Sequence, residues 1–332
     1  MQNQLWYMSS FRKASQDGES IAQVQLSQGQ EGWILEWISS ENGELTRERW
    51  YAGWSWEELQ LCCRCQTAGK QAAGYEPLIE GLEMDWMIDG RAMFSQMLYY
   101  YAESRLKESE PLFEKLREWR KELALKEQVP PFIIASNRLL GMISVFKPQT
   151  LEELKQLPGV GRQKLEKYGK TWLQMLQGEK QPGSFPLDWV AAEIDAQAFR
   201  RWYFQNKEKQ YKQEWEEVQL RKQMLQGLEQ MTPLNELAEQ TGKTRRELLE
   251  WIERLDQEGY DAAAWTEREL QDMPGETISQ SFKWFAELGD RYLKPVMQKV
   301  YGEPEPDQLE SIYEKLRLMR ILYRKERRQA AV

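Results

Sequence analysis

The chain has 332 residues, of which 41% are hydrophobic and 12% aromatic, so packed cores can form and disorder throughout is excluded. Its length predicts two or three domains. The sequence contains no histidine, which excludes Ser-His-Asp and Cys-His catalytic sites and the common histidine-containing zinc sites. It has no secretory signal and no apolar run of about 18 residues, so we expect a cytoplasmic protein that does not span a membrane.

The formal net charge of −8 is unevenly distributed along the chain. Residues 1–110 have a net charge of −8 and residues 179–332 a net charge of −5, whereas residues 111–178 have 12 Lys and Arg against 7 Asp and Glu, a net charge of +5. A polyanion is therefore expected to bind the middle block if it binds at all. The acidic flanks also suggest the hypothesis that they occupy the basic block and shield it.

The first part of the chain predicts a small α+β domain. Short runs rich in aromatic and aliphatic residues are separated by glycine-containing turns, which is typical of strands. Ser55 and Glu58 form the pattern of a capping box that begins a helix extending to about Thr67. We expect the core of this domain to contain most of its tryptophans. The predicted strands cover residues 5–11, 21–26, 33–38 and 45–51.

From Ala92 onward the apolar spacing of three and four residues predicts helices. Pro130 and Pro131 end a helix that follows Pro111, and residues 178–186 are rich in glycine and proline, as linkers are. No strand is expected in the last 145 residues. The further predicted helices cover residues 136–145, 150–156, 162–176, 188–229, 276–287, 290–300 and 307–328, with two more around a turn at 241–243.

Residues 112–177 contain an ordered set of motifs. They are PPFIIASNRLL at 130–140, Pro148 with Thr150 at a helix start, LPGVG at 157–161, and KLEKYGK at 164–170. This stretch resembles the HRDC domain, a helical module found at the C-termini of RecQ-type helicases and RNase D. The resemblance implies a compact five-helix fold that binds single-stranded or partly duplex DNA in many members and structured RNA in others.

The glycine-containing turn before the helix at 162–176 is the first candidate site. A turn of this kind exposes backbone N–H groups that have no intrahelical partner, and the helix dipole adds positive potential there. Gly159, Val160 and Gly161 can therefore bind a phosphate oxygen without reading a base. Phe132, which follows two prolines, can stack on an unpaired base. The basic candidates are Arg162, Lys164, Lys167 and Lys170 beside the turn, Lys115, Arg117, Arg120 and Lys121 on the first helix, and Arg138.

Each of these features also has a purely structural interpretation. Gly159 and Gly161 can serve only to allow a tight turn between helices. Phe132 can belong to the core instead of stacking on a base. The basic residues can form a solvated face, because carboxylates lie among them at ion-pair spacing. These carboxylates are Glu114, Glu118, Glu122 and Glu166.

Residues 231–323 are similar to the helix-turn-helix domain at the extreme C-terminus of some bacterial RecQ proteins. The matching features are TPL at 232–234, the turn TGKT at 241–244, and the later ELG and YLKPV motifs at 287–289 and 292–296. In a DNA-reading version, the helix at 244–257 enters the major groove with Arg245 and Arg246 at its leading end. The acidic residues of the same helix favour a scaffold or docking domain instead. They are Glu247, Glu250 and Glu253.

Several patterns resemble functional sites but lack an essential part. Gly242-Lys243-Thr244 lacks the glycine five residues earlier that a phosphate-binding loop needs, so we reject ATP binding there. The cysteines at 62, 63 and 65 lack the fourth ligand and the separated second pair of a zinc site. The acidic groups Glu193 with Asp195, and Glu83, Asp85 and Asp89, give only weak support to a Mg²⁺-dependent nuclease.

These observations predict a mainly α protein that has no cofactor and no metal. The preferred function is a non-enzymatic protein that binds DNA, or RNA, in repair, recombination or replication. The alternatives are a scaffold that docks a helicase or nuclease, and a carboxylate-metal nuclease, for which no assembled catalytic set is found. The predicted segments are an α+β domain at 1–110, an HRDC-like domain at 111–178, a linker at 179–186, a long helical segment at 187–230, and a helix-turn-helix-like domain at 231–328.

Overall fold

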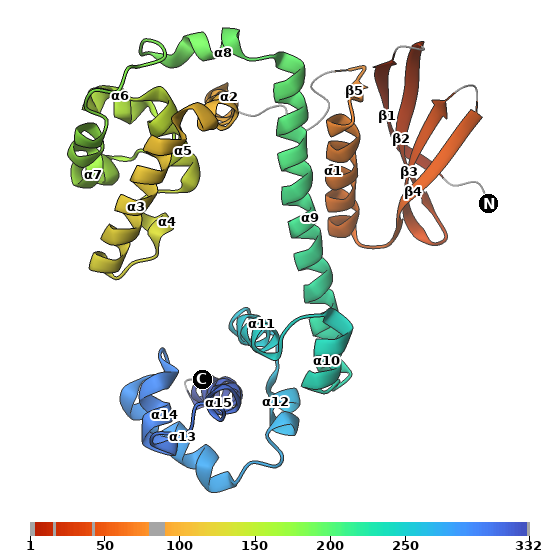
Figure 1. Cartoon of the computed structure of the whole chain (residues 1–332). Helices are drawn as coiled ribbons and strands as arrows, with labels where there is room; N and C mark the ends of the chain where they lie inside the picture. Colours follow the sequence, from red (N-terminus) through yellow and green to blue (C-terminus); the bar gives the residue numbers. More distant parts are fainter. Residues whose placement is uncertain (1–3, 16–17, 42–43, 80–89, 331–332) are drawn as a thin grey trace. The chain divides into compact units, whose positions relative to one another are not determined.

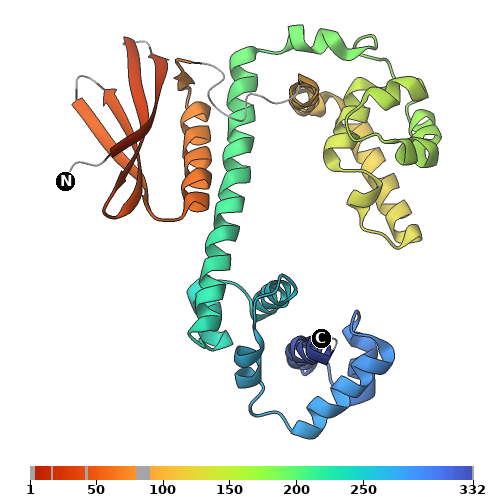
Figure 2. The same ribbon diagram turned by 180° about the vertical axis from the view of Figure 1, so that it is seen from behind.

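The computed structural model describes residues 4–15, 18–41, 44–79 and 90–330. It divides into two compact units, residues 1–212 and 213–332. Figures 1 and 2 show the chain from opposite sides. The protein is mainly α, with one antiparallel sheet at its N-terminal end, as the sequence predicts.

The sheet is a meander of four long strands to which a very short fifth strand is added. The strand order is β4-β3-β2-β1-β5, and all pairs are antiparallel. The four predicted strands are confirmed, and each extends beyond its predicted ends. Helix α1 (Trp56–Ala72) begins where expected, with Ser55 Oγ accepting a 3.2 Å hydrogen bond from the Glu58 N–H. The strands are β1 (Gln4–Ser15), β2 (Gly18–Gly29), β3 (Gly32–Glu41), β4 (Glu44–Gly53) and β5 (Glu76–Pro77).

The tryptophans of this part do not mainly fill the core, which corrects the sequence prediction. Trp37 is buried between a stacked Trp50 and an edge-on Tyr75. By contrast, Trp54 is 67% exposed, because it lies where the chain leaves the last strand for α1. Trp6 and Trp56 are also about half exposed. One helix packs against the sheet near β3 and β4, so part of the aromatic content stays at the surface.

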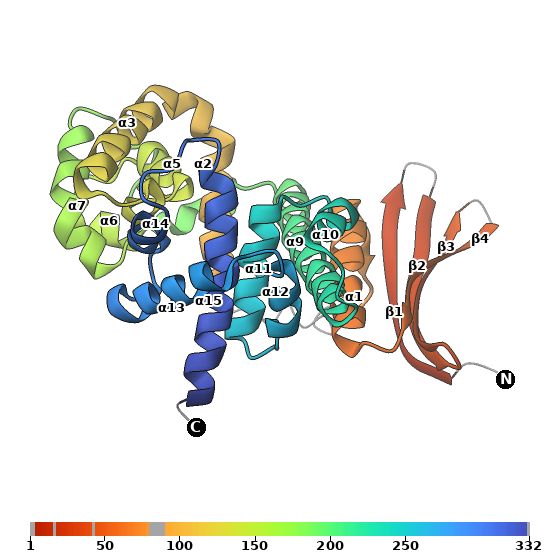
Figure 3. The same ribbon diagram turned by 90° about the horizontal axis from the view of Figure 1, so that it is seen from below.

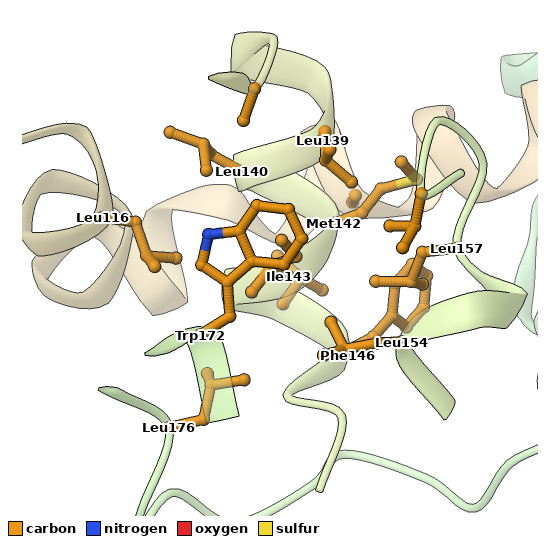
Figure 4. Close-up of a cluster of buried hydrophobic side chains, with 14 of the residues drawn as sticks. Leu116, Leu139, Leu140, Met142, Ile143, Phe146, Leu154, Leu157, Trp172 and Leu176 are labelled. Carbon is orange, nitrogen blue, oxygen red and sulfur yellow. The ribbon is translucent and has the colours of Figure 1, made fainter. Parts of the chain in front are cut away.

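The next helices share one core, which Figure 4 shows around Trp172. Trp172 and Phe146 are completely buried in it. Two of the helix starts are capped by side chains: Ser136 accepts from the Leu139 N–H and Thr150 from the Glu153 N–H, both at 3.2 Å. The helices are α2 (Gly90–Arg105), η2 (Leu106–Ser109), α3 (Glu110–Glu127), α4 (Pro131–Ile134), α5 (Asn137–Phe146), α6 (Leu151–Gln156) and α7 (Arg162–Met175).

The segment after α7 is irregular but packs against the same core. The Trp189 indole N–H donates a 2.8 Å hydrogen bond to the Ser184 carbonyl, and Leu187 and Val190 are buried in the cluster. The chain then forms η3 (Leu187–Trp189), α8 (Val190–Glu193) and the long helix α9 (Ala196–Glu229).

The second unit is helical, and its core is built from side chains of α10 to α15 and the C-terminal part of α9. Figure 3 shows the ribbons of these helices. Trp265 and Phe285 are its largest buried side chains. None of the helices in the described ranges is long and apolar enough to cross a membrane. The helices are α10 (Leu234–Thr241), α11 (Arg245–Gln257), α12 (Ala263–Glu269), α13 (Gly275–Leu288), α14 (Leu293–Tyr301) and α15 (Leu309–Ala330).

Candidate nucleic-acid interface

The loop between α6 and α7 has two glycines that face open space. Gly159 has a φ of +89°, a conformation that favours glycine, and a Cβ added at Gly159 or Gly161 would meet no heavy atom within 4 Å. Val160 between them is buried, and its N–H donates a 3.1 Å hydrogen bond to the Leu157 carbonyl. Val160 therefore anchors the loop, and its amide is not available to a ligand.

The amides that are available to a ligand belong to the first turn of α7, just after this loop. Gly161 is the N-cap of α7, and no side chain caps this helix end. The first amide that bonds back into the helix is that of Leu165, which donates a 3.0 Å hydrogen bond to the Gly161 carbonyl. The N–H groups of Arg162, Gln163 and Lys164 precede it and have no intrahelical acceptor. Together with the helix dipole, these amides can bind an anion.

The basic residues beside this helix end differ in how strongly they are already engaged. Arg162 is paired with Glu166 at 2.7 Å, but the pair is exposed and therefore weak. Lys167 donates to Glu127 at 2.6 Å, and this hydrogen bond, with Tyr168, raises the pKa of Lys167. Within the described ranges, Lys164 and Lys170 make no ion pair, so they are free to approach a phosphate.

On α3, two of the four predicted cations are exposed and unpaired. Lys115 and Lys121 form no ion pair with any described residue, whereas Arg117 is held by Glu114 at 2.6 Å. The predicted solvated face of ion pairs is thus only partly formed. Glu114 and Glu166 have basic partners at helical spacing, but Glu118 and Glu122 have none among the residues described.

Arg120, the fourth predicted cation on α3, is buried, and the structure removes it from the candidate surface. Its Nη1 donates to the Ala135 carbonyl at 2.7 Å and its Nη2 to Asn137 Oδ1 at 2.8 Å. Burial, together with the charge of Arg117, lowers the pKa of Arg120. The sequence contained a signal for this position, because Leu112, Leu116, Arg120 and Ala124 recur every fourth residue on the buried face of α3.

Phe132 is at the surface, which excludes the interpretation that it belongs to the core. Its side chain is 65% exposed, and its neighbour Ile133 is 54% exposed. Leu125, near the end of α3, is 74% exposed. Arg138 is exposed and stacks on the Tyr99 ring, with 5.4 Å between the guanidinium carbon and the ring centroid.

In the second unit, α10 and α11 lie on either side of Gly242, but the two predicted arginines are engaged. Arg245 Nη2 contacts Glu314 of α15 at 2.9 Å, and Arg246 contacts Glu250 at 3.2 Å. Thr244 and Glu247 form a reciprocal capping box that begins α11. The groove-entering role of this helix stays a prediction.

The remaining candidates are the cysteines of α1 and the acidic groups. Cys62 and Cys65 are buried, and Cys62 donates a hydrogen bond to the Trp50 carbonyl. Asp195 Oδ1 accepts a 2.6 Å hydrogen bond from the Ala198 N–H at the start of α9. The residues described contain no group of three or more Cys, Asp or Glu side chains that could hold a metal ion. Glu83, Asp85 and Asp89 lie outside the described residues.

Comparison with known proteins identifies the part of the chain that contains the α6–α7 loop. Residues 109–176 match the HRDC domain. This segment is an HRDC domain. The resemblance seen in the sequence is thereby confirmed, and the uncapped N-terminus of α7 belongs to this domain.

The relatives are DNA helicases, of which the chain matches only a small part. The RecQ ATP-dependent DNA helicase of Bacillus subtilis is 44% identical over 70 residues, which are 21% of this chain and 12% of the relative. The RecQ of Haemophilus influenzae is 36% identical over 69 residues, 21% of this chain and 11% of the relative. The ATP-dependent DNA helicase UvrD2 of Mycobacterium tuberculosis is 33% identical over 69 residues, 21% of this chain and 10% of the relative. No solved structure matches the chain significantly.

Proposed function

We propose that this chain is a non-enzymatic accessory protein that binds DNA, single-stranded or forked and without sequence preference, in repair, recombination or replication. The observation that supports this most directly is the exposed, uncapped N-terminus of α7 in the HRDC domain, with Lys164 in its first turn and Lys170 further along the same helix, both without an ion pair among the described residues. The matched relatives are all named as DNA helicases, which favours DNA as the ligand.

The proposed contact is electrostatic. Backbone amides and lysine side chains neutralise phosphates without distinguishing bases, so affinity should not depend on sequence and should fall steeply as salt is raised. An exposed aromatic side chain such as Phe132 adds stacking on unpaired bases, which favours single strands and forks over duplex. The net charge of +5 over residues 111–178 lies in the same domain, although the whole chain is acidic.

The experiment is a fluorescence-anisotropy titration of the full chain with single-stranded, forked and duplex DNA of matched length at low and high salt. We expect saturable binding at low salt that weakens as salt rises. Lys164→Glu combined with Lys170→Glu should weaken binding by about tenfold or more. Each lost phosphate contact means that fewer counterions are released on binding, so the slope of log affinity against log salt concentration should become shallower by about one per contact. Phe132→Ala should reduce binding to single strands more than to duplex.

The matched control is Lys107→Glu combined with Lys180→Glu, two exposed lysines that change the net charge equally but lie outside the candidate set. This control should retain most of the affinity. Equal loss in both double variants would show that only net charge matters, and absence of binding at low salt would contradict the proposal. Circular dichroism of each variant ensures that a loss of affinity does not reflect unfolding.

A specific observation favours a second candidate function, the docking of a partner protein by the HRDC domain. Leu125, Phe132 and Ile133 are large apolar side chains that are more than half exposed, at the end of α3 and in α4. Phe132 and Ile133 are adjacent in the chain, and contiguous exposed apolar side chains are typical of interaction surfaces. Leu125→Asp with Ile133→Asp should abolish co-purification with a candidate helicase while leaving DNA affinity unchanged. If the same variant instead abolishes DNA binding, these residues belong to the DNA interface.

A further inference from the structure

The N-terminal sheet borders a hollow of about 420 Å³ that the protein itself does not fill. The inner faces of β1, β2 and β3 form one side of it, α1 forms another, and the N-terminal half of α9 forms a third; in Figure 1, α9 runs alongside α1. Hollows of this size are typical of sites for small molecules. Its walls are almost entirely apolar or aromatic and include Tyr7, Phe11, Leu26, Leu59, Phe204 and Tyr211.

The charge of the lining is unusual for this part of the chain. Residues 1–110 have a net charge of −8, yet among the residues that the structure describes the only charged side chains that line the hollow are two cations, Arg64 and Lys207. Neither forms an ion pair with any residue in the described ranges. Lys207 Nζ lies 5.8 Å and 5.6 Å from the ring centroids of Tyr203 and Tyr211, so its charge is held among aromatic rings at the border of the apolar space.

We propose that this hollow binds a small amphipathic anion, with an apolar body against the sheet and a single negatively charged head between Arg64 and Lys207. Transferring an apolar body from water to these walls is favourable in proportion to the area buried. Two unpaired cations complement one anionic head. A nucleic-acid chain is a poorer occupant, because its many phosphates would be repelled by the acidic surroundings of residues 1–110.

The probe is decanoate below its micelle concentration, titrated into the full chain by isothermal calorimetry. We expect one saturable site per chain. Two ligands with the same alkyl body separate the apolar contribution from the charge: decan-1-ol should bind more weakly, and decyltrimethylammonium should not bind measurably. A heat-capacity change of negative sign is expected, since apolar surface is buried.

Two variants test the placement of the ligand. Arg64→Glu combined with Lys207→Glu should weaken decanoate binding by about tenfold or more, which corresponds to about 1.4 kcal/mol per factor of ten, and should affect decan-1-ol much less. Ala68→Leu adds apolar bulk to a side chain that lines the hollow and should weaken both ligands. The matched control, Lys209→Glu with Lys180→Glu, changes the charge equally at exposed positions that do not line the hollow and should bind like the unmodified chain.

Cys63 provides an independent readout, because it also lines the hollow. Decanoate should slow alkylation of Cys63 by iodoacetamide, and the charge-reversal variant should lose this protection. Absence of saturable decanoate binding, or binding that neither the charge reversal nor Ala68→Leu alters, would overturn the proposal. Displacement of bound decanoate by a short single-stranded oligonucleotide would also overturn it, and would assign the hollow to an unpaired base instead.

Discussion

The guanidinium of Arg120 donates a 2.7 Å hydrogen bond to the carbonyl oxygen of Ala135. Ala135 lies between α4 and α5, in the segment where the sequence resemblance is most evident, and is itself buried. The same guanidinium donates to Asn137 at the start of α5. One basic side chain therefore fixes the end of α4 and the beginning of α5 against α3, so the exposed Phe132 is presented from a defined position.

We predict that Arg120→Ala destabilises the HRDC domain, and that any loss of DNA binding follows from this destabilisation and not from a lost contact between Arg120 and DNA. The variant leaves the buried Ala135 carbonyl without its donor, which costs about 1–3 kcal/mol, and the loss of packing adds to this. Chemical denaturation followed by tryptophan fluorescence measures the change in the free energy of unfolding. Lys121→Ala, one residue along and exposed, is the control and should change stability by less than about 0.5 kcal/mol. A variant that unfolds like the unmodified chain but fails to bind DNA would contradict this assignment.

Much of the fold could be predicted because local signals and packing agree. Ser55, Ser136 and Thr150 mark helix starts in the sequence, and each accepts a hydrogen bond from an amide three residues later. The alternation in residues 33–38 predicted a strand and is confirmed. The two-residue strand β5 could not be predicted, because pairing with β1 and not its own sequence defines it.

The backbone conformation of the candidate site could be predicted from the sequence, but the partners of its side chains could be predicted only in part. The glycine spacing at 159 and 161 indicated the turn and the open helix end correctly. The ion pair of Lys167 with Glu127 joins residues 40 positions apart, so no local spacing could reveal it. The hollow beside the sheet is likewise built from strands, α1 and α9, which are distant in sequence.

A substitution at the N-cap of α7 separates helix stability from phosphate binding. Gly161→Asp should stabilise α7 by about 0.5–1 kcal/mol, because an aspartate at the N-cap accepts from the free amides and complements the helix dipole. A Cβ added at Gly161 would meet no heavy atom within 4 Å, so the substitution should not disturb the loop. The same carboxylate occupies the proposed phosphate site, and DNA affinity at low salt should fall about tenfold.

Gly161→Asn is the matched control for this test. Asparagine caps a helix about as well as aspartate but brings no negative charge, so it should stabilise α7 with a smaller loss of affinity. Thermal melting and anisotropy titrations of the three proteins give both quantities. Stabilisation of the helix with DNA affinity unchanged in both variants would show that phosphate does not bind at this helix end.

The three cysteines should react very differently with alkylating reagents. Burial, with smaller contributions from Cys63 and Cys65, raises the pKa of Cys62 from 9.0 to about 12, and burial also raises the pKa of Cys65. Because the thiolate is the reactive form, Cys63 should be alkylated first by iodoacetamide at pH 8. Peptide mass spectrometry measures the order of reaction, and all three should react alike in denaturant. Equal rates in the folded protein would contradict the burial of Cys62.

The raised pKa of the Cys62 thiol should make the N-terminal part less stable at alkaline pH. Below pH 9 the Cys62 thiol is protonated in both the folded and the unfolded chain, so this contribution to stability is fully present. As the pH rises from 9.0 toward about 12, the unfolded chain releases the proton while the folded chain keeps it, and stability is progressively lost. Cys62→Ser or Cys62→Ala should flatten this alkaline decline in thermal-melting experiments, and an unchanged decline would contradict the prediction.

In the second unit, a buried carboxylate joins α11 to α15, and its loss should loosen both helices. Glu253 accepts from Arg320 Nε at 2.8 Å and from Arg317 Nη1 at 2.7 Å, with little of its side chain exposed. Glu253→Gln removes the negative charge between two arginines and leaves the buried Arg320 without its carboxylate partner, which costs about 3–5 kcal/mol. Hydrogen exchange should accelerate in α11 and α15 but not in α3 or α7.

Glu250→Gln is the control for this prediction, because Glu250 lies on the same helix and contacts the same Arg317, at 2.9 Å, but is 46% exposed. Water screens an ion pair of that kind, so its loss should cost no more than about 1 kcal/mol and leave exchange in α15 nearly unchanged. Equal acceleration by the two substitutions would show that burial of Glu253 does not decide how firmly α11 is held.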